Sequence, residues 1–217
     1  MSRLSTISLF SDYIDGEFAW RHKEMIDMTL IIKQTSDKGI KKSLLRAAVP
    51  LLYAHWEGFI KKASEAVINF VSEQRLRHDE LAMCFWVLGV KRDLHTLAES
   101  GNAMEAAKAL ESILASGARR TRFNAKGNVS TDSNLSSRVL ERIASTIGVD
   151  YAIFAPSAPL IDTALVDRRN HIAHGQLEYV DEERFSSLMT EIFGLMRTYK
   201  NIIENMIVRG EYKRAGT

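Results

Sequence analysis

The strongest constraint on this chain is one long amphipathic run, from about Ile40 to Glu73. Its apolar residues step by three or four positions, the repeat that places side chains on one face of an α-helix. These positions are Leu45, Val49, Leu52, Trp56, Phe59, Ala63, Val67 and Phe70. A long helix with such a stripe must bury it against other helices, so the pattern predicts a helical bundle. Pro50 lies within the run and removes one backbone donor, which predicts a kink or a join between two shorter helices.

Helical periodicity or helix-forming composition recurs along most of the remaining chain. Residues 79–90 are apolar nearly all round, which predicts a short buried helix, with a strand as the alternative. Ser133 or Asn134 is the predicted cap of the helix that follows the central loop, and Gly148 is placed to end it. Gly175 suits the left-handed position just past a helix end. The expected helices are 10–32, 40–73, 79–90, 103–114, 135–147, 160–174 and 181–208.

These elements predict one all-α domain that covers residues 1–217. The chain has 12 Gly and 3 Pro, too few for the many turns of an all-β fold. We expect a helical bundle of two long core helices, at 40–73 and 181–208, with shorter helices between them. The predicted outlying segments are an N-terminal helix at 1–38, a basic loop insertion at 116–133 and a flexible tail at 209–217.

Charge and cysteine content limit the expected partners, metal sites and cellular compartment of the protein. The chain carries 29 Lys and Arg against 27 Asp and Glu, a net charge of +2 that neither demands nor excludes a nucleic-acid partner. The single cysteine, Cys84, rules out an intrachain disulfide and a Cys-rich metal site, which indicates a reducing compartment. Asp12, Asp15 and Glu17 interrupt the stretch where a signal peptide would be apolar, and no window is apolar enough for a membrane span. We therefore expect a cytoplasmic protein without a membrane segment.

The densest group of chemically active side chains lies at residues 167–175, DRRNHIAHG. A helix turns ~100° per residue, so Asn170 and His174 share one face, whereas Arg169 and His174 are about 140° apart. His174 stands in the last predicted turn, where the helix dipole favours the imidazolium and where it can take or give a proton near neutral pH. Arg and His are also common dipole partners near a helix end, so these residues alone are compatible with a purely structural role.

Three blocks of the sequence resemble the HEPN superfamily, in the order found in its stand-alone ribonuclease branch. The family's Arg–x4–His motif is matched by RNHIAHG, which places its Arg, polar residue and His at Arg169, Asn170 and His174. The stretch LLRAAVPLLYAHWEGFIKK resembles the first core helix of that branch, which carries an LYAHWEGF-type string. The stretch NLSSRVLERIASTIGVD resembles the segment that the branch places before its motif helix. The resemblance covers roughly residues 46–208, with a variable middle.

This resemblance implies an all-helical bundle that dimerises through its motif helix and cleaves RNA without a metal or other cofactor. In such an endoribonuclease the 2′-hydroxyl of RNA attacks the phosphodiester and leaves a 2′,3′-cyclic phosphate. His174 would be the general base or acid, and Arg169 would stabilise charge on the phosphate oxygens. Asn170 would orient His174 or bind the phosphate. Two chains would then form a composite site.

The same resemblance suggests a biological role and a regulatory partner. Many members are toxins or effectors of anti-phage defence, which implies an antitoxin or defence-system partner. Members controlled by nucleotidyltransferases carry Tyr two residues after the motif His, where this chain has Gln176. The alternative from another class is a non-catalytic interaction or regulatory module that dimerises through the same helix.

Further side chains are candidates for supporting roles. Glu57 lies on the helix expected to pack near the motif helix, so it is a candidate partner for Arg169. His171 is expected to flank the active face or to pair with Asp167. His171 and His174 lack the spacing of a zinc-protease motif and a third ligand, so no metal site is predicted.

The central loop is a candidate RNA-binding surface. Basic residues with an aromatic among them are typical of proteins that hold single-stranded RNA by phosphate contacts and stacking. The residues are Arg119, Arg120, Arg122, Phe123 and Lys126. The alternative is an ordinary solvated loop.

Overall fold

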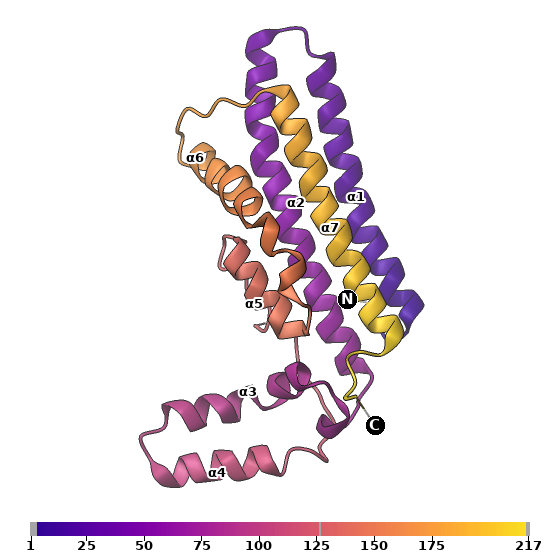
Figure 1. Ribbon diagram of the computed structural model, residues 1–217, viewed down its shortest axis with the longest axis vertical. Coiled ribbons are helices and arrows are strands. Elements are labelled where there is room, and N and C mark those ends of the chain that lie inside the picture. The colour runs from indigo at the N-terminus through magenta and orange to yellow at the C-terminus, as the bar shows by residue number, and fades with distance from the viewer. Residues whose placement is uncertain (1–3, 126, 216–217) are drawn as a thin grey trace.

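Three long helices lie along one another and form the body of the molecule (Figure 1). They are α1 (Ile7–Gln34), α2 (Lys38–Glu73) and α7 (Glu182–Arg209) in the computed structural model, which describes residues 4–125 and 127–215. Every apolar residue of the predicted α2 stripe is buried, and α1 and α7 both pack against α2. The predicted all-α bundle is confirmed.

Two expectations about the long helices need correction. The core contains a third long helix, because α1 packs against α7 as well as α2 and buries Phe10, Ile14 and Met25 completely. In addition, α2 continues through Pro50 as one helix, without a join. Proline's fixed φ fits a helix, so the neighbouring turns of this long, well-packed element tolerate the loss of one backbone hydrogen bond.

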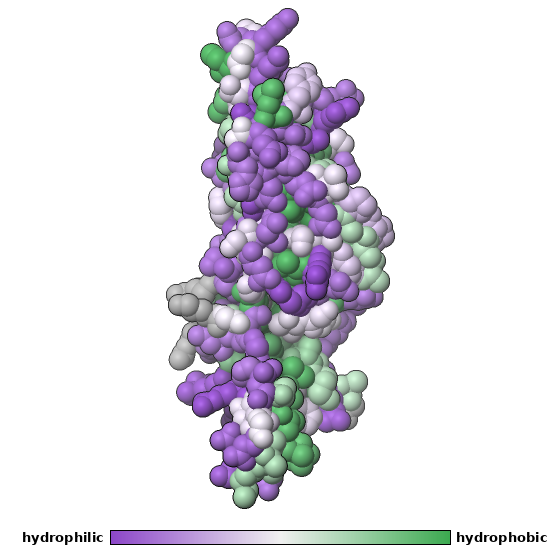
Figure 2. Space-filling model, turned by 90° about the vertical axis from the view of Figure 1, so that its left-hand side faces the viewer, coloured by the Kyte–Doolittle hydropathy of each residue, from purple (hydrophilic) through white to green (hydrophobic). Residues whose placement is uncertain are grey.

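A helical hairpin projects from the lower end of the bundle in Figure 1. A short 3₁₀ turn, η1 (His78–Glu80), leads into α3 (Met83–Glu99), which packs against α4 (Ala103–Leu114). The structure confirms a helix in the region predicted at 79–90, but its bounds and burial need correction, because α3 begins at Met83, runs on to Glu99 and leaves Met83 62% exposed. The hairpin covers only one side of α3. Figure 2 shows apolar side chains gathered along this lower part, where the exposed ones are Met83, Val87, Met104, Leu110 and Leu114.

The remaining helices form a second row beside α2. After the irregular segment that follows α4, α5 (Ser137–Ile147) packs against α2 and α3. Its cap is Ser136 rather than the predicted Ser133 or Asn134, and Gly148 ends it with φ 77° as predicted. Two short 3₁₀ turns then lead to η4 (Leu160–Asp167) and α6 (Arg168–Ala173), the segment that carries the motif. No helix within the described residues is long and apolar enough to cross a bilayer.

The C-terminal segment is packed rather than frayed as far as the structure describes it. Gly210 ends α7 with φ 69°, and the chain then folds back onto the end of α2. Tyr212 is buried against Phe70, with ring centroids 5.7 Å apart. The backbone N–H of Ala82 donates to the Tyr212 carbonyl (2.9 Å). The predicted flexible tail at 209–217 therefore needs correction, because its single tyrosine anchors an otherwise polar stretch; residues 216–217 lie outside the described range.

Acid should weaken the contact between α1 and α2. His55 is buried there, its Nε2 lies 2.9 Å from Glu24, and burial lowers its pKa below the ordinary 6.5 despite that carboxylate. The unfolded chain therefore binds the extra proton more readily, so this group's stabilisation is present above pH 6.5 and is lost as pH falls below it. We expect the free energy of unfolding, measured by urea denaturation, to fall between about pH 7 and 5.

The variant His55→Gln separates this effect from general acid sensitivity. It removes the titrating group, so its free energy of unfolding should depend less on pH over the same interval. His78 is also buried, and burial lowers its pKa, so His78→Gln should reduce the pH dependence of the free energy of unfolding in the same direction. An unchanged pH dependence in His55→Gln would contradict the assignment of this histidine.

Candidate functional site

The motif segment is one continuous helical stretch with two geometries. Its first part, η4, is a π-helix, and its second part, α6, is an α-helix. Stretches of π-helix are rare and occur frequently at functional sites. Asp162 of η4 accepts hydrogen bonds from the backbone N–H (2.7 Å) and hydroxyl (2.5 Å) of Ser137, which fastens the segment to α5. Gly175 follows with φ 75°, the left-handed conformation predicted for it.

Three uncharged groups hold the guanidinium of Arg169. It lies over the ring of Tyr53, with its central carbon 3.8 Å from the ring centroid. One terminal nitrogen donates to the side-chain oxygen of Asn170 (2.7 Å) and the other to the backbone carbonyl of Ser133 (3.1 Å). A guanidinium has five N–H donors, so these two bonds leave others for an external anion. Arg169 and Asn170 are therefore brought together as one unit.

Tyr53 is itself fixed in the core of α2. It is 3% exposed, and its hydroxyl accepts a hydrogen bond from the backbone N–H of Leu135 (2.7 Å). Burial raises its pKa; a hydrogen bond to Glu57 adds to that rise, and Arg169 opposes it. The phenol is thus neutral at ordinary pH. Glu57 reaches Arg169 only through Tyr53, since no ion pair joins the two among the described residues.

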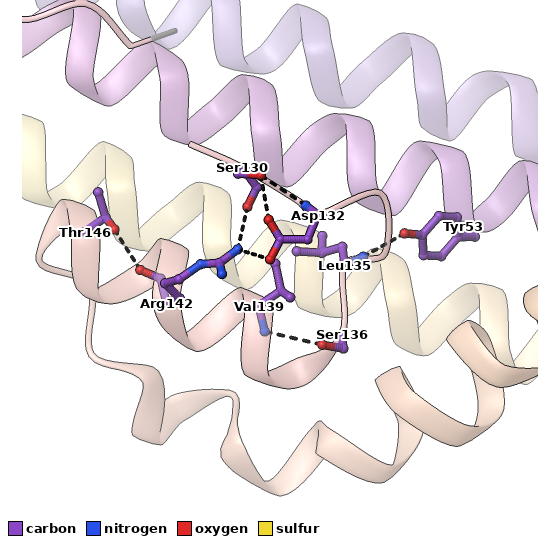
Figure 3. Close-up of polar contacts among 8 residues, drawn as sticks. All are labelled: Tyr53, Ser130, Asp132, Leu135, Ser136, Val139, Arg142 and Thr146. Atoms are coloured by element: carbon purple, nitrogen blue, oxygen red, sulfur yellow. Dashed lines mark hydrogen bonds and ion pairs between the residues drawn. The ribbon is translucent and has the colours of Figure 1, made fainter. Parts of the chain in front are cut away.

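The Ser133 carbonyl that Arg169 bonds belongs to the loop at residues 130–135. Figure 3 shows how Ser130, Asp132 and Leu135 of this loop are held. Asp132 and Ser133 both have left-handed backbones, with φ 50° and 59°, which costs L-residues about 1–2 kcal/mol each. Asp132 accepts hydrogen bonds from the Ser130 hydroxyl (2.7 Å) and from Arg142 of α5 (2.6 Å). These two bonds hold the pKa of the Asp132 carboxyl below its usual value. The loop is therefore a strained but well-anchored turn.

His174 lies apart from this unit. It is exposed at the C-terminal end of α6, where its backbone N–H donates to the Asn170 carbonyl (2.9 Å). Its imidazole makes no hydrogen bond or ion pair with any residue that the structure describes. Arg169, in contrast, is half-buried against α2. A single chain therefore presents the two motif side chains in different surroundings.

The remaining motif neighbours pair with the loop after α6. Glu178 accepts a hydrogen bond from Arg168 (3.1 Å) and lies 3.7 Å from Nδ1 of His171. The expected partner of His171, Asp167, is exposed instead. Arg46 of α2 donates to the Gln176 carbonyl (2.8 Å) and so fastens the same loop. The loop carries two strongly exposed apolar side chains, Leu177 (95%) and Tyr179 (67%).

The predicted RNA-binding loop lies far from the motif along α2. The backbone of Phe123 bonds to Ser72, nineteen residues after Tyr53, which is about 28 Å along the helix. Phe123 is 9% exposed and stacks on Phe85, so its ring is not available to a base in this conformation. The physical reason is that its ring fills the core between α2 and α3.

The arginines of this loop are partly engaged within the chain. Arg119 donates to Ser112 (2.6 Å) and Arg120 to the Arg75 carbonyl (3.2 Å). Arg122 is exposed and lines a shallow hollow. Lys126 lies outside the described residues. The five predicted residues therefore do not form one free surface beside Arg169.

Sequence reasoning missed the environment of Arg169. Tyr53 precedes Glu57 by one helical turn, a visible spacing, but nothing in the sequence pairs it with a residue more than a hundred positions away. The contribution of Ser133 is a backbone carbonyl, which no residue type can signal. No group of three or more His, Cys, Asp and Glu side chains suited to a metal ion occurs in residues 4–125 and 127–215.

The comparison with known families covers nearly the whole chain. The family model described as HEPN_MAE_28990-like HEPN matches residues 10–212, from the first turn of α1 to beyond α7. No curated protein and no solved structure matches the chain. The match includes the helices that hold Arg169 and His174, and the all-helical bundle agrees with it. The chain belongs to the HEPN superfamily, in this MAE_28990-like family.

Proposed function

We propose that this protein is a metal-independent endoribonuclease that acts as a homodimer. Membership of the HEPN superfamily suggests a nuclease or RNA-related function. The observation that carries the finer proposal is the setting of Arg169, which is fixed by uncharged groups and keeps free N–H donors. Such an arginine retains its full charge for a phosphate. No step of the proposed reaction needs a cofactor.

The proposed reaction is a transesterification within the RNA strand. The 2′-hydroxyl oxygen attacks phosphorus, the bond to the 5′-oxygen breaks, and a 2′,3′-cyclic phosphate forms. One proton leaves the 2′-hydroxyl and one reaches the departing 5′-oxygen. The exposed imidazole of His174 is suited to either transfer. Arg169 stabilises the charge that builds on the phosphate oxygens, and Asn170 orients the guanidinium through its side-chain oxygen.

A second copy of the chain supplies the missing half of the site. Within one chain Arg169 faces α2 while His174 is exposed, and among the described residues no hydrogen bond joins their side chains. Leu177 and Tyr179 lie directly after the motif and expose apolar surface that a second chain would cover. We propose that α6 and the following loop meet their symmetry mates there. Arg169 of one protomer then works with His174 of its partner.

The biological setting follows from the resemblance. We propose a cytoplasmic toxin or anti-phage effector restrained by an antitoxin or defence-system partner. Glu57 and His171 act only by supporting Tyr53 and the loop after α6. Arg119, Arg120 and Arg122 are proposed as contacts for RNA distant from the cleaved phosphate. Phe123 is left out because its ring is buried.

Cleavage of RNA in EDTA tests the proposal directly. The wild-type protein should cut total RNA with chelator present and leave 2′,3′-cyclic phosphate ends. His174→Ala should lower the rate by about 10²- to 10⁴-fold, because a proton-transfer group is lost. Arg169→Lys should also impair cleavage, since a point charge replaces the planar fork. The rates are measured on a labelled RNA by gel electrophoresis, with end groups identified by mass spectrometry.

The control for this experiment is His95→Ala. His95 is exposed on α3, away from the motif helix, so its loss should leave cleavage unchanged. Cleavage abolished by EDTA would contradict the metal-independent mechanism. If neither wild type nor variant cuts RNA, while the protein still dimerises through α6, the non-catalytic module becomes the better interpretation.

A mixture of two inactive variants tests whether the site is shared between protomers. Arg169→Ala and His174→Ala homodimers should each be inactive. A heterodimer of the two contains one complete set if Arg169 acts with the partner's His174, so activity should return to about half per dimer. The measurement is cleavage after co-expression and purification through two different tags. A heterodimer as inactive as its parents would indicate that each protomer uses its own pair.

A further inference from the structure

A tight loop, residues 130–135, precedes α5 and is bonded to it through Asp132 and Arg142 (Figure 3), and its Ser133 carbonyl accepts a hydrogen bond from the motif arginine, Arg169. Its two central residues, Asp132 and Ser133, adopt the left-handed backbone with φ 50° and 59°. Neither is glycine, so this conformation persists only where the surroundings hold it in place. Strain of this kind clusters at functional sites, and the groups that hold it are therefore informative.

The loop is held from two opposite sides. On one side, Asp132 accepts a bond from Arg142 of α5 (2.6 Å), and Arg142 also donates to the Ser130 carbonyl (3.1 Å). On the other side, the N–H of Leu135 donates to the hydroxyl of Tyr53 on α2 (2.7 Å). The strained turn is thus bonded to two helices, α5 and α2.

The turn places the backbone carbonyl of Ser133 beside Arg169. Ser133 O accepts the hydrogen bond from Arg169 (3.1 Å), and Ser133 directly follows Asp132. Tyr53 holds both the far end of the loop, through its hydroxyl, and the guanidinium, through its ring. Arg142 is therefore linked to Arg169 through Asp132 and Ser133, although no hydrogen bond joins the two arginines among the described residues.

We propose that the Asp132–Arg142 ion pair is a positioning device for Arg169. By holding the left-handed turn closed, the pair places the Ser133 carbonyl that bonds Arg169 and so keeps the guanidinium over the Tyr53 ring. The consequence for cleavage rests on the proposed ribonuclease function; the positioning itself does not. Asp132 and Arg142 are positioning residues that do not touch RNA.

The charges of Asp132, Arg142 and Arg169 agree with this proposal. Arg142 is paired with Asp132, so its charge is partly balanced within the chain. Arg169 is held by a ring, an amide oxygen and a carbonyl, so its charge is kept for the substrate. The Asp132–Arg142 ion pair thus lies outside the site and helps to position Arg169, which has no carboxylate partner among the described residues.

Two single variants and their combination test the proposal. Asp132→Gly removes the carboxylate, while glycine adopts the same φ without strain, so the fold should tolerate the change. Arg142→Ala removes the other partner. Each should lower kcat by up to about fivefold, because the ion pair is half exposed, with KM within about twofold, because Arg169 is displaced rather than lost. The double variant should be no slower than the worse single variant, because both break one interaction.

The second measurement needs no RNA. In the wild type the side-chain N–H of Arg169 lies over the Tyr53 ring, so its NMR signal, assigned with Arg169→Lys, should be shifted upfield by the ring current. Asp132→Gly and Arg142→Ala should both move this signal toward the position of a free arginine. A purely structural role would alter stability but leave the signal in place.

Arg138→Ala is the matched control. Arg138 is an exposed arginine one turn before Arg142 on the same helix, and it makes no hydrogen bond or ion pair among residues 4–125 and 127–215. Its loss should change neither the signal nor kcat. An Arg169 signal that stays unchanged in Asp132→Gly and Arg142→Ala overturns the proposal, whatever the rates do. A displaced signal in a protein that cleaves no RNA would support the positioning and refute the ribonuclease function.

Discussion

Burial of the apolar stripe of α2 is the constraint on which the rest of the structure depends. One side of this 36-residue helix is covered by α1 and α7, and the other by α5, η4 and α6. A stripe this wide cannot be covered by one neighbour, which is why short helices are drawn in beside the long ones. The same packing places the motif helix against Tyr53. The site thus depends on the core for its position.

The helical framework was accessible from sequence because it follows from periodicity and caps. The ends of α4 and α7, the glycine at 148 and the left-handed Gly175 are local properties, set by residues a few positions apart. The errors lie where burial was inferred from composition. Residues 79–90 are apolar, yet Met83 and Val87 remain exposed because α4 and α5 cover only part of the surface of α3, the part that carries Phe85 and Val90. Conversely, the polar stretch after α7 is ordered by one tyrosine, Tyr212.

Only part of the candidate site could be predicted from the sequence, for a related reason. The motif residues Arg169, Asn170 and His174 can be named from the sequence, since their spacing is local. What surrounds Arg169 comes from Tyr53 and Ser133, which are distant in the chain and meet only when α2, α5 and α6 pack. Glu57 was expected to pair with Arg169 directly. Instead it bonds to Tyr53, a result that depends on which way one buried ring points.

This indirect arrangement has a physical advantage over a direct salt bridge. A carboxylate against Arg169 would hold the guanidinium firmly but would also cancel the charge that a phosphate must meet. Arg168, the adjacent residue, is paired with Glu178, and Arg142 is paired with Asp132. Arg169 is instead held by an aromatic face and two neutral oxygens, which orient it without neutralising it. Glu178 and Asp132 thus bind neighbouring arginines, and the arginine proposed to meet RNA keeps its charge.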